Sequence, residues 1–259
     1  MVRHEIAGLK SFLIDIDGVL YVGDKPIEGA RECIETFGER GYRYRFVSNT
    51  TGRCRGSIAE KLRGLGFEIP EEYILTPPIA DLGQVRQKRC FLLTGGDVYR
   101  DFEIGGATIA DYDVDYVVIG DAGEKFTFER LNRAFRLVMD GAEIIALEKD
   151  RYWMGSDGLM LSAGPFVAAL EYATGKDAEV VGKPSKKFFE LAFRELGTAP
   201  DETAMIGDDI FTDIGGAKRR GMMGILVRTG KYREDAVKNS EINPDLVIDS
   251  ISHIFEIKI

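Results

Sequence analysis

The sequence predicts an α/β fold: parallel sheets with helices on their faces, divided between two domains. Short apolar runs suitable for buried strands alternate with stretches whose apolar residues recur at helical spacing. Glycine or an acidic residue ends many of these stretches, as expected where a strand or helix stops. A chain of 259 residues is long enough for one large domain or two smaller ones, each with its own core.

The first elements along the chain set this pattern. Residues 11–16 form a continuous apolar run that ends in an acid, which suits a strand covered on both faces. Residues 28–40 place apolar residues on one helical face, and Gly41 follows as a stop signal. A strand over 44–47 and a helix over 58–65 come next. This alternation predicts parallel strands joined by helices.

Two prolines, Pro77-Pro78, interrupt the pattern, and two further series of elements follow. In the first series we expect strands over 90–93, 116–119 and 143–146, with helices over about 127–139 and 164–173. In the second series we expect helices over about 186–196 and 211–219, with strands over 203–206 and 224–227. The proline pair and the positions of the acidic motifs favour one domain made of residues 1–78 and 180–259, with residues 79–179 inserted as a second domain.

The composition argues against several classes of function. The formal net charge is −9 and the isoelectric point is about 5, so the surface repels nucleic acids and anionic membranes. Only two histidines are present, His4 and His253, which disfavours a histidine-based triad or zinc site. The widely spaced Cys33, Cys54 and Cys90 are expected to be reduced thiols. Without a signal-like or membrane-spanning run, the protein is predicted to be cytoplasmic.

Two acids, Asp15 and Asp17, follow the first expected strand, with Gly18 after them. The pair is weak by itself, because 43 Asp and Glu residues produce several such pairs by chance. Its position gives it weight, since open parallel sheets bind ligands at the carboxyl ends of their strands. Gly18 would let the chain turn with no side chain in the way. The alternative is a solvated turn in which the acids cap the next element.

A second acidic cluster, Asp208, Asp209 and Asp213, follows the expected strand over 203–206. Two strand ends rich in aspartate could converge on one hard cation. Mg²⁺ in proteins is bound by one or two carboxylates together with waters and phosphate oxygens. Taken alone, Asp213 is better explained as the cap of the helix that follows.

Lys183, Ser48 and Asn49 are the candidates for binding phosphate. Lys183 lies between an apolar strand and Pro184 at the start of a helix, which would fix the direction of its side chain. A fixed ammonium group could hold phosphate and neutralise a carboxylate nucleophile. Ser48 and Asn49 end the expected strand over 44–47, where hydroxyl, amide and backbone N–H groups could donate to phosphoryl oxygens. Taken alone, that stretch is better explained as a polar turn.

Together these segments resemble the haloacid dehalogenase-like hydrolase superfamily. In the family's order, the four motifs are matched by Asp15-Ile16-Asp17-Gly18, Ser48, Lys183, and Gly207-Asp208-Asp209 with Asp213. Further stretches resemble subfamily IIA, which contains nitrophenylphosphatase-like and nucleotide-phosphatase-like members: Val19-Leu20-Tyr21, Val47-Ser48-Asn49, Asp157-Gly158-Leu159, residues 164–171, Val181-Gly182-Lys183-Pro184, and Thr229-Gly230 with Lys231-Tyr232.

The resemblance implies a role for each of the acids. Asp15 would be the nucleophile and a Mg²⁺ ligand. Asp17 would be the general acid and base, with its backbone carbonyl on the metal. Asp208 would bind Mg²⁺ directly, and Asp209 or Asp213 would support it.

The resemblance also implies roles for the phosphate-binding residues and for the insertion. Ser48 would bind the phosphoryl group with Asn49 beside it, and Lys183 would hold the charge of the nucleophile and the phosphate. Residues 79–179 would be an α/β cap over a Rossmann-like core. Where family members often carry a Thr-Asn-Pro-Asp-like stretch, residues 147–150 read Leu-Glu-Lys-Asp, so the cap does not identify the substrate.

The predicted function is Mg²⁺-dependent hydrolysis of small phosphate monoesters through an aspartyl-phosphate on Asp15. Two alternatives use the same acids. A phosphotransferase or mutase would pass the phosphoryl group to another acceptor. A non-enzymatic phospho-acceptor module would retain it, although receiver modules are about half this length and need no cap. The expected partner is a small phosphorylated metabolite, and the resemblance is compatible with a homodimer formed through the cap.

Overall fold

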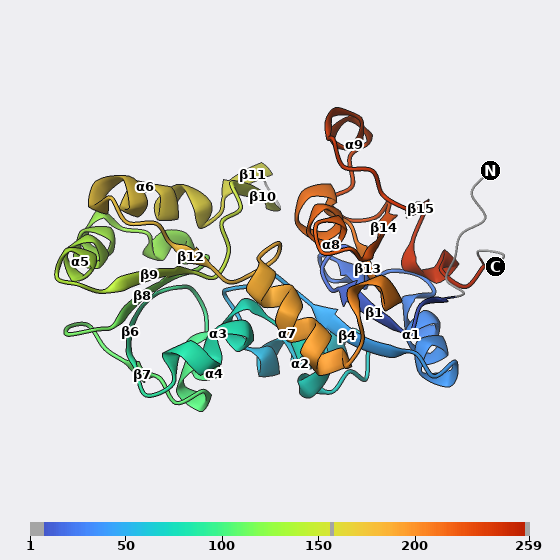
Figure 1. The fold of residues 1–259 in the computed structure, drawn as a ribbon, viewed down its shortest axis with the longest axis horizontal. Coiled ribbons are helices and arrows are strands. Elements are labelled where there is room, and N and C mark those ends of the chain that lie inside the picture. The colour runs from blue at the N-terminus through green and yellow to red at the C-terminus, as the bar shows by residue number, and fades with distance from the viewer. Residues whose placement is uncertain (1–7, 156–157, 257–259) are drawn as a thin grey trace. The chain divides into compact units, whose positions relative to one another are not determined.

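The computed structural model describes residues 8–155 and 158–256 and consists of two compact units (Figure 1). The first unit comprises Met1–Ser48, Ala59–Leu75 and Phe188–Ile259, and the second comprises Asn49–Ile58 and Thr76–Lys187. Each unit contains a parallel β-sheet, so the predicted α/β class is confirmed.

The first unit is built around a six-stranded sheet in the order β15-β14-β13-β1-β4-β5, with parallel pairing throughout. The strands are β1 (Ser11–Asp15), β4 (Arg43–Val47), β5 (Ile74–Leu75), β13 (Thr203–Gly207), β14 (Met223–Val227) and β15 (Leu246–Ile248). β1 therefore lies between β13 and β4, two strands that come from distant parts of the chain.

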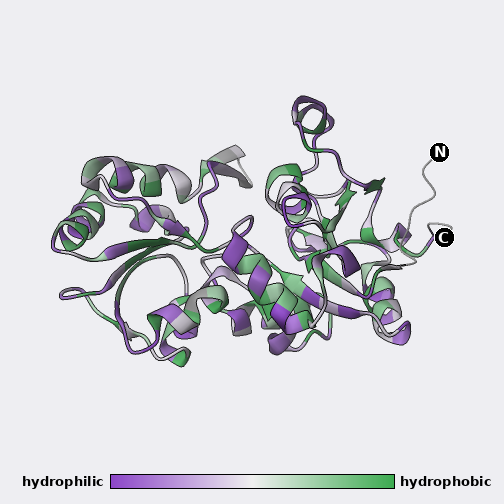
Figure 2. Ribbon diagram, viewed as in Figure 1, coloured by the Kyte–Doolittle hydropathy of each residue, from purple (hydrophilic) through white to green (hydrophobic). Residues whose placement is uncertain are grey.

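β1 is buried along its whole length because both faces of the sheet are covered. The ring of Phe12 lies 4.7 Å from that of Phe37 in α1 (Ala30–Glu39). Ile14 is fully buried and pairs with Ile206 of β13. Figure 2 shows hydrophobic residues concentrated in the central strands. A continuous apolar run is what a parallel strand covered on both sides requires.

The remaining elements of the first unit connect these strands. They are the hairpin β2 (Tyr21–Val22) and β3 (Lys25–Pro26), a π-helix (Ile210–Ile214), the helices α8 (Gly215–Lys218) and α9 (Glu234–Asn239), and short 3₁₀ turns at Glu71–Tyr73, Pro200–Glu202 and Ile251–His253. Two helices, α2 (Arg55–Gly64) and α7 (Lys186–Leu196), contain residues of both units.

The second unit has a five-stranded parallel sheet in the order β12-β9-β8-β6-β7 and a separate hairpin, β10-β11. The strands are β6 (Arg89–Leu93), β7 (Thr108–Ile109), β8 (Tyr116–Ile119), β9 (Glu143–Ala146), β10 (Tyr152–Gly155), β11 (Gly158–Leu161) and β12 (Glu179–Val180). The helices are α3 (Pro77–Val85), α4 (Tyr99–Ile104), α5 (Phe128–Met139) and α6 (Gly164–Thr174), with a 3₁₀ turn at Gly123–Lys125.

Alternate residues of β6 pack into two separate cores. Phe91 and Leu93 belong to a cluster that includes α5 and α6 residues. Cys90 and Leu92 belong to another cluster that includes residues of α3 and α4. Because neighbouring strand residues point to opposite faces, the sheet of the second unit is a middle layer between two helical layers.

The structure corrects two sequence expectations. Pro77 and Pro78 do more than interrupt the chain: they begin α3, where proline's missing N–H costs nothing in the first turn. The helix expected over about 211–219 instead begins as the π-helix Ile210–Ile214, and α8 covers only Gly215–Lys218. Most longer predicted elements are confirmed, and α7 matches its predicted bounds of 186–196.

Several smaller observations complete the description. His4 and Asp157 lie outside the described residues. The three cysteines are buried and form no disulfide. Within residues 8–155 and 158–256, every helix is too short or too polar to cross a lipid bilayer.

Candidate active site

Three neighbouring strands of the first unit bring candidate residues to one edge of the sheet. Asp15 is the last residue of β1, Ser48 follows β4, and Asp208 follows β13. The chain leaves β1 for β4 and β5 on one side, and later returns to β13, β14 and β15 on the other. Open parallel sheets bind ligands at the carboxyl ends of strands at such a reversal of strand order.

Asp15, Asp208 and Asp213 form a compact acidic trio in the first unit. One carboxylate oxygen from each lies within 4.8 Å of the others, and the three residues are only 6%, 3% and 1% exposed. Buried carboxylates this close repel one another and lose their hydration. Oxygen donors in a buried, negatively charged cluster suit a hard divalent cation. The structure therefore brings together three of the predicted metal-site acids.

The pKa of Asp208 reflects both its burial and this repulsion. Burial raises the pKa of Asp208 to about 7, and the neighbouring charge of Asp213 adds to the shift. The backbone N–H of Lys231, which donates to Asp208 Oδ2 at 2.7 Å, acts in the opposite direction. A bound cation would replace the proton that Asp208 otherwise retains near neutral pH.

Three glycines make room for the carboxylates. A Cβ atom on Gly18 would lie 1.9 Å from Asp208 Oδ2, and one on Gly230 would lie 2.0 Å from the same oxygen. A Cβ atom on Gly207 would lie 2.3 Å from Asp213 Oδ2. Any larger residue at these positions would displace a carboxylate. The site therefore depends on glycine at all three positions.

The π-helix after β13 separates the functions of Asp209 and Asp213. Asp209 is the N-cap: its Oδ1 accepts from the backbone N–H groups of Phe211 and Thr212 at 2.8 and 3.1 Å. Asp213 lies inside the turn, and its Oδ2 accepts from the N–H of Asp209 at 3.2 Å. The capping role that the sequence alone favoured for Asp213 therefore belongs to Asp209. π-turns of this kind occur frequently at functional sites.

Asp17 lies in the loop between β1 and the β2-β3 hairpin and is exposed, unlike the acidic trio. The loop is fixed by the buried side chains of Ile16, Val19 and Leu20. The N–H of Gly18 donates to the carbonyl of Tyr21 at 2.8 Å, and that of Leu20 donates to Ile16 at 2.9 Å. An exposed carboxylate on an anchored loop can reach a substrate while its backbone stays in place.

The phosphate-binding candidates are divided between the two units. Ser48 belongs to the first unit, is buried, and donates its backbone N–H to the carbonyl of Leu75 at 3.1 Å. Asn49 and Lys183 belong to the second unit. Asn49 Nδ2 donates to the Lys183 carbonyl at 2.9 Å, and the Lys183 N–H donates to Asn49 Oδ1 at 2.8 Å. Asn49 thus fixes the backbone of Lys183, a role that the sequence did not suggest, while direct phosphate contact by either residue stays a prediction.

Glu148, left unassigned by the sequence, serves packing in the second unit. It is buried, and its Oε1 accepts from the hydroxyl of Ser162 at 2.7 Å and from the N–H of Ala163 at 2.9 Å. Tyr152 and Trp153 of β10 are exposed by 59% and 40%. Neither observation identifies a ligand.

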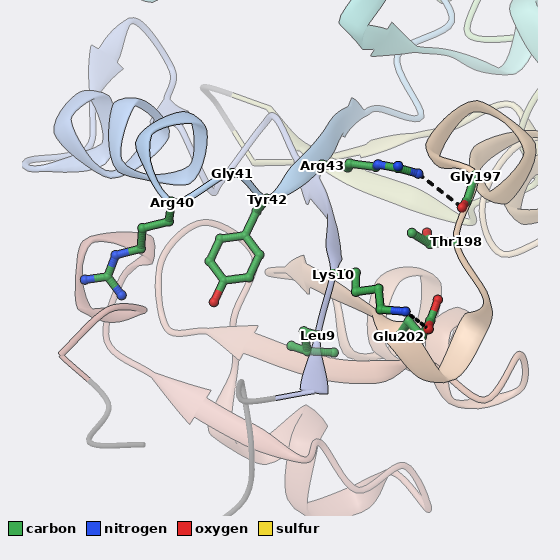
Figure 3. A pocket seen from close by; sticks show the side chains of 9 residues that line it. All are labelled: Leu9, Lys10, Arg40, Gly41, Tyr42, Arg43, Gly197, Thr198 and Glu202. Atoms are coloured by element: carbon green, nitrogen blue, oxygen red, sulfur yellow. Dashed lines mark hydrogen bonds and ion pairs between the residues drawn. The ribbon is translucent and has the colours of Figure 1, made fainter.

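A separate hollow lies at the opposite, amino-terminal edge of the first unit's sheet (Figure 3). Its volume is about 480 Å³, and its lining includes Lys10, Arg43 and Glu202. Lys10 forms an ion pair with Glu202, and Arg43 Nη1 donates to the carbonyl of Leu196 at 2.9 Å. None of the acidic trio lines this hollow, so it is distinct from the candidate active site.

Comparison with known proteins identifies the family of this chain. The models described as "Haloacid dehalogenase-like hydrolase" and "HAD-hyrolase-like" match residues 12–106 and 180–254. The haloacid dehalogenase-like hydrolase domain-containing protein 2 of Bos taurus is 45% identical over 249 residues, which cover 95% of this chain and 94% of that protein. The chain belongs to the haloacid dehalogenase-like hydrolases.

Further relatives of this haloacid dehalogenase-like hydrolase are phosphatases by name. The phospholysine phosphohistidine inorganic pyrophosphate phosphatase of Xenopus laevis is 38% identical, with 96% of this chain and 94% of that protein covered. The crystal structure of a 4-nitrophenylphosphatase from Thermotoga maritima matches with a TM-score of 0.90 and 28% identity, covering 98% of this chain and 99% of that one. The resemblance to subfamily IIA is confirmed, and the enzyme is a phosphatase.

Sequence reasoning missed two contributions to the site. The sequence did not indicate that Gly207 makes room for Asp213. It also did not indicate that the segment Thr229-Gly230-Lys231 contacts Asp208. The available signal was positional: the latter segment follows the strand over 224–227, so it too lies at the carboxyl edge of the sheet. Its contact with Asp208 depends on tertiary packing that sequence spacing does not encode.

Proposed function

We propose that this phosphatase hydrolyses small phosphate monoesters in a Mg²⁺-dependent reaction that passes through an aspartyl-phosphate on Asp15. The observation that carries the proposal is the buried trio of Asp15, Asp208 and Asp213 at the carboxyl edge of the sheet. Buried carboxylate oxygens this close to one another suit a divalent cation. A cation would balance the charge of the carboxylates, and it would also bind a phosphate group next to Asp15 at the end of β1.

The donor set fits Mg²⁺. The three carboxylates offer hard oxygen ligands, and among residues 8–155 and 158–256 no sulfur or imidazole donor joins the cluster. Bound there, Mg²⁺ would polarise the phosphoryl oxygens and offset their charge. Asp208 and Asp15 are the residues that would hold it, with the backbone carbonyl of Asp17, and Asp213 and Asp209 would keep Asp208 and its loop in place.

The first chemical step would transfer the phosphoryl group to the enzyme. A carboxylate oxygen of Asp15 attacks phosphorus, and the bond between phosphorus and the ester oxygen breaks. Asp17, in its protonated form, donates its proton to the departing oxygen, so the product leaves as an alcohol. The exposure of Asp17 supports this role, because a proton donor must reach the leaving group beyond the buried acids.

The second step would release phosphate. Asp17, now a carboxylate, accepts a proton from a water molecule whose oxygen attacks phosphorus. The bond between phosphorus and Asp15 breaks, inorganic phosphate leaves, and both acids return to their starting states. The two displacements at phosphorus sum to the reaction of the ester with water, which gives the alcohol and inorganic phosphate.

Ser48 and Lys183 would bind the transferred phosphate. The hydroxyl of Ser48 is a neutral donor for a phosphoryl oxygen, and the ammonium group of Lys183 would offset negative charge on Asp15 and phosphate. The two hydrogen bonds between Asn49 and the Lys183 backbone support this assignment, because they fix the backbone from which the Lys183 side chain extends.

We also propose that residues 79–179 act as a cap domain for a core made of residues 1–78 and 180–259. The cap would select a small phosphorylated metabolite, and a homodimer could form through it. The names of the relatives extend the substrate class to be tested to inorganic pyrophosphate and phosphoamino acids.

The decisive experiment compares Asp15→Asn with Asp201→Asn on p-nitrophenyl phosphate, with MgCl₂ or with excess EDTA. Asp201 is exposed in the 3₁₀ turn before β13, so its substitution is a matched loss of one carboxylate away from the trio. We expect wild type and Asp201→Asn to turn over only with Mg²⁺ and Asp15→Asn to be inactive but folded. Activity of Asp15→Asn, or activity in EDTA, would contradict the proposal.

The same proteins can be tested on a panel of sugar phosphates, nucleotides, inorganic pyrophosphate and pyridoxal phosphate. Release of free phosphate from the preferred ester supports hydrolysis. Transfer to an added acceptor sugar without phosphate release would instead identify a phosphotransferase, and a stable phosphorylated Asp15 without turnover would identify a phospho-acceptor module.

A further inference from the structure

The segment Thr229-Gly230-Lys231, which follows β14, contacts both acidic loops of the site. The backbone N–H of Lys231 donates to Asp208 Oδ2 at 2.7 Å. The hydroxyl of Thr229 donates to the carbonyl of Gly18, in the loop that carries Asp17. One short segment therefore links the carboxylate after β13 to the loop after β1.

Steric contacts reinforce these hydrogen bonds. A Cβ atom on Gly230 would lie 2.0 Å from Asp208 Oδ2 and 2.5 Å from the Cα atom of Gly18. A Cβ atom on Gly18 would in turn lie 1.9 Å from Asp208 Oδ2. The Oδ2 atom thus lies against the backbones of Gly18 and Gly230 and accepts a hydrogen bond from Lys231. These contacts favour one orientation of the carboxylate.

We propose that Thr229-Gly230-Lys231 is a positioning element that fixes the orientation of the Asp208 carboxylate and thereby sets the enzyme's affinity for Mg²⁺. This inference rests on the proposed function, because it assigns Asp208 to the metal. A carboxylate held by these contacts loses less rotational freedom when it binds a cation, as expected of a ligand oriented by its outer partners.

Thr229 extends the effect to the β1 loop. Its hydroxyl holds the carbonyl of Gly18, the residue next to Asp17. The two metal-binding loops therefore keep their spacing through a third loop. Removing the Thr229 hydroxyl should loosen that spacing while leaving Asp208 chemically intact.

The first test compares Gly230→Ala with Gly221→Ala. Both glycines have positive φ, +61° and +77°, so alanine is strained at either position, but a Cβ atom on Gly221 would meet nothing within 4 Å. We expect Gly230→Ala to lose more thermal stability than Gly221→Ala, because its Cβ atom would also overlap the Cα atom of Gly18. Titration with MgCl₂ in a calorimeter should show a Kd increased about 10- to 100-fold for Gly230→Ala alone.

The second test compares Thr229→Val with Thr229→Ser, using the same Mg²⁺ titration and the turnover of p-nitrophenyl phosphate. Valine keeps the shape of threonine but removes the hydroxyl, and serine restores the hydroxyl. We expect Thr229→Val to weaken Mg²⁺ binding several-fold and Thr229→Ser to recover it. This comparison decides the matter if Gly230→Ala does not fold.

The outcomes separate the inference from the proposed function. If wild type binds no Mg²⁺, both are wrong. If wild type binds Mg²⁺ and needs it for turnover, while Gly230→Ala or, in its absence, Thr229→Val binds Mg²⁺ as wild type does, the positioning role alone is overturned. Equal loss of affinity in Gly230→Ala and Gly221→Ala would also overturn it, because strain without contact would then explain the effect.

Discussion

The two edges of the first unit's sheet are built from the same strands, β13, β1 and β4, but they treat charge in opposite ways. At the amino edge, opposite charges are paired near the surface, as in Lys10 with Glu202. At the carboxyl edge, three carboxyl groups are gathered in the interior, those of Asp15, Asp208 and Asp213. Pairing stabilises the fold, whereas burying carboxyl groups close together costs stability that a bound cation can offset.

The amino edge also satisfies its buried hydroxyls locally. Ser11 Oγ lies 2.9 Å from Thr203 Oγ1 and 2.7 Å from Thr198 Oγ1, and Thr203 donates to the carbonyl of Ala199 at 2.8 Å. This network ties the start of β1 to the start of β13. The same two strands thus have a hydrogen-bonded hydroxyl network at their amino ends and the buried acids of the candidate active site at their carboxyl ends.

The largest expected effect comes from Asp208→Asn. Loss of one carboxylate from the trio should lower Mg²⁺-dependent turnover by at least about 100-fold. At pH 8 without metal, the variant should be more stable than wild type by on the order of 2 kcal/mol, because a buried charge is removed. Urea unfolding and initial-rate measurements test both parts. A variant that loses activity and also loses stability at pH 8 would contradict the electrostatic account.

A second effect is the pH dependence of metal binding. Asp208 has a pKa of about 7 in the folded, metal-free protein, above its ordinary value of 3.8. Its protonation therefore favours the folded state below about pH 4, and this contribution is lost as the pH rises through 7. Because Mg²⁺ competes with that proton, affinity should fall by up to about tenfold for each unit below pH 7.

Calorimetric titration at pH 8, 7 and 6 measures this dependence directly, together with the increase in Tm produced by Mg²⁺. The increase should be larger at pH 8 than at pH 6. Equal affinity across this range would show that Asp208 is not protonated in the metal-free enzyme near neutral pH.

A smaller effect is expected from Thr203→Val at the amino edge. Thr203 is fully buried, and valine would leave the hydroxyls of Ser11 and Thr198 with fewer partners. The free energy of unfolding should fall by about 1–3 kcal/mol, while the Mg²⁺ affinity stays at the wild-type value. A change in Mg²⁺ affinity in this variant would contradict the view that the amino edge stabilises the fold without contributing to metal binding.

The smallest effect is expected from Glu202→Gln, which breaks the ion pair with Lys10. Both side chains are substantially exposed, so solvent screens the interaction. Turnover should be unchanged, and thermal melts should show little or no shift. A marked loss of activity would show that the amino edge contributes to the chemistry.

The parts of the fold that were predictable are those with a strong local signal. The run over residues 12–14 is apolar on both faces, and α7 has a clear helical period, so both were recognised. β5 has only two residues, Ile74 and Leu75, and no period can be read from so short a strand. The same limit applies to β12 and to the β2-β3 hairpin, whose pairing depends on neighbours distant in sequence or on loop geometry.

The site was predictable as a set of acids and unpredictable as an arrangement. Asp209 precedes the helical turn and Asp213 lies within it, and spacing alone could not show that Asp209 caps the turn while Asp213 joins Asp15 and Asp208. Gly230 has a neighbour, Asp208, that no local pattern identifies. Spacing indicates which residues reach an edge, but close packing decides which atoms they touch.

The position of β1 in the middle of its sheet has a consequence for synthesis. Ser11 and Thr203, paired at the start of β1 and β13, are 192 residues apart in the chain. During synthesis, Asp15 therefore leaves the ribosome long before Asp208 is made. Pairing of strands so far apart in the chain is also slow. Under the proposed mechanism, a nascent chain would carry the nucleophile before the metal site is complete, and it would neither bind the ion nor cleave phosphate until β13 has emerged.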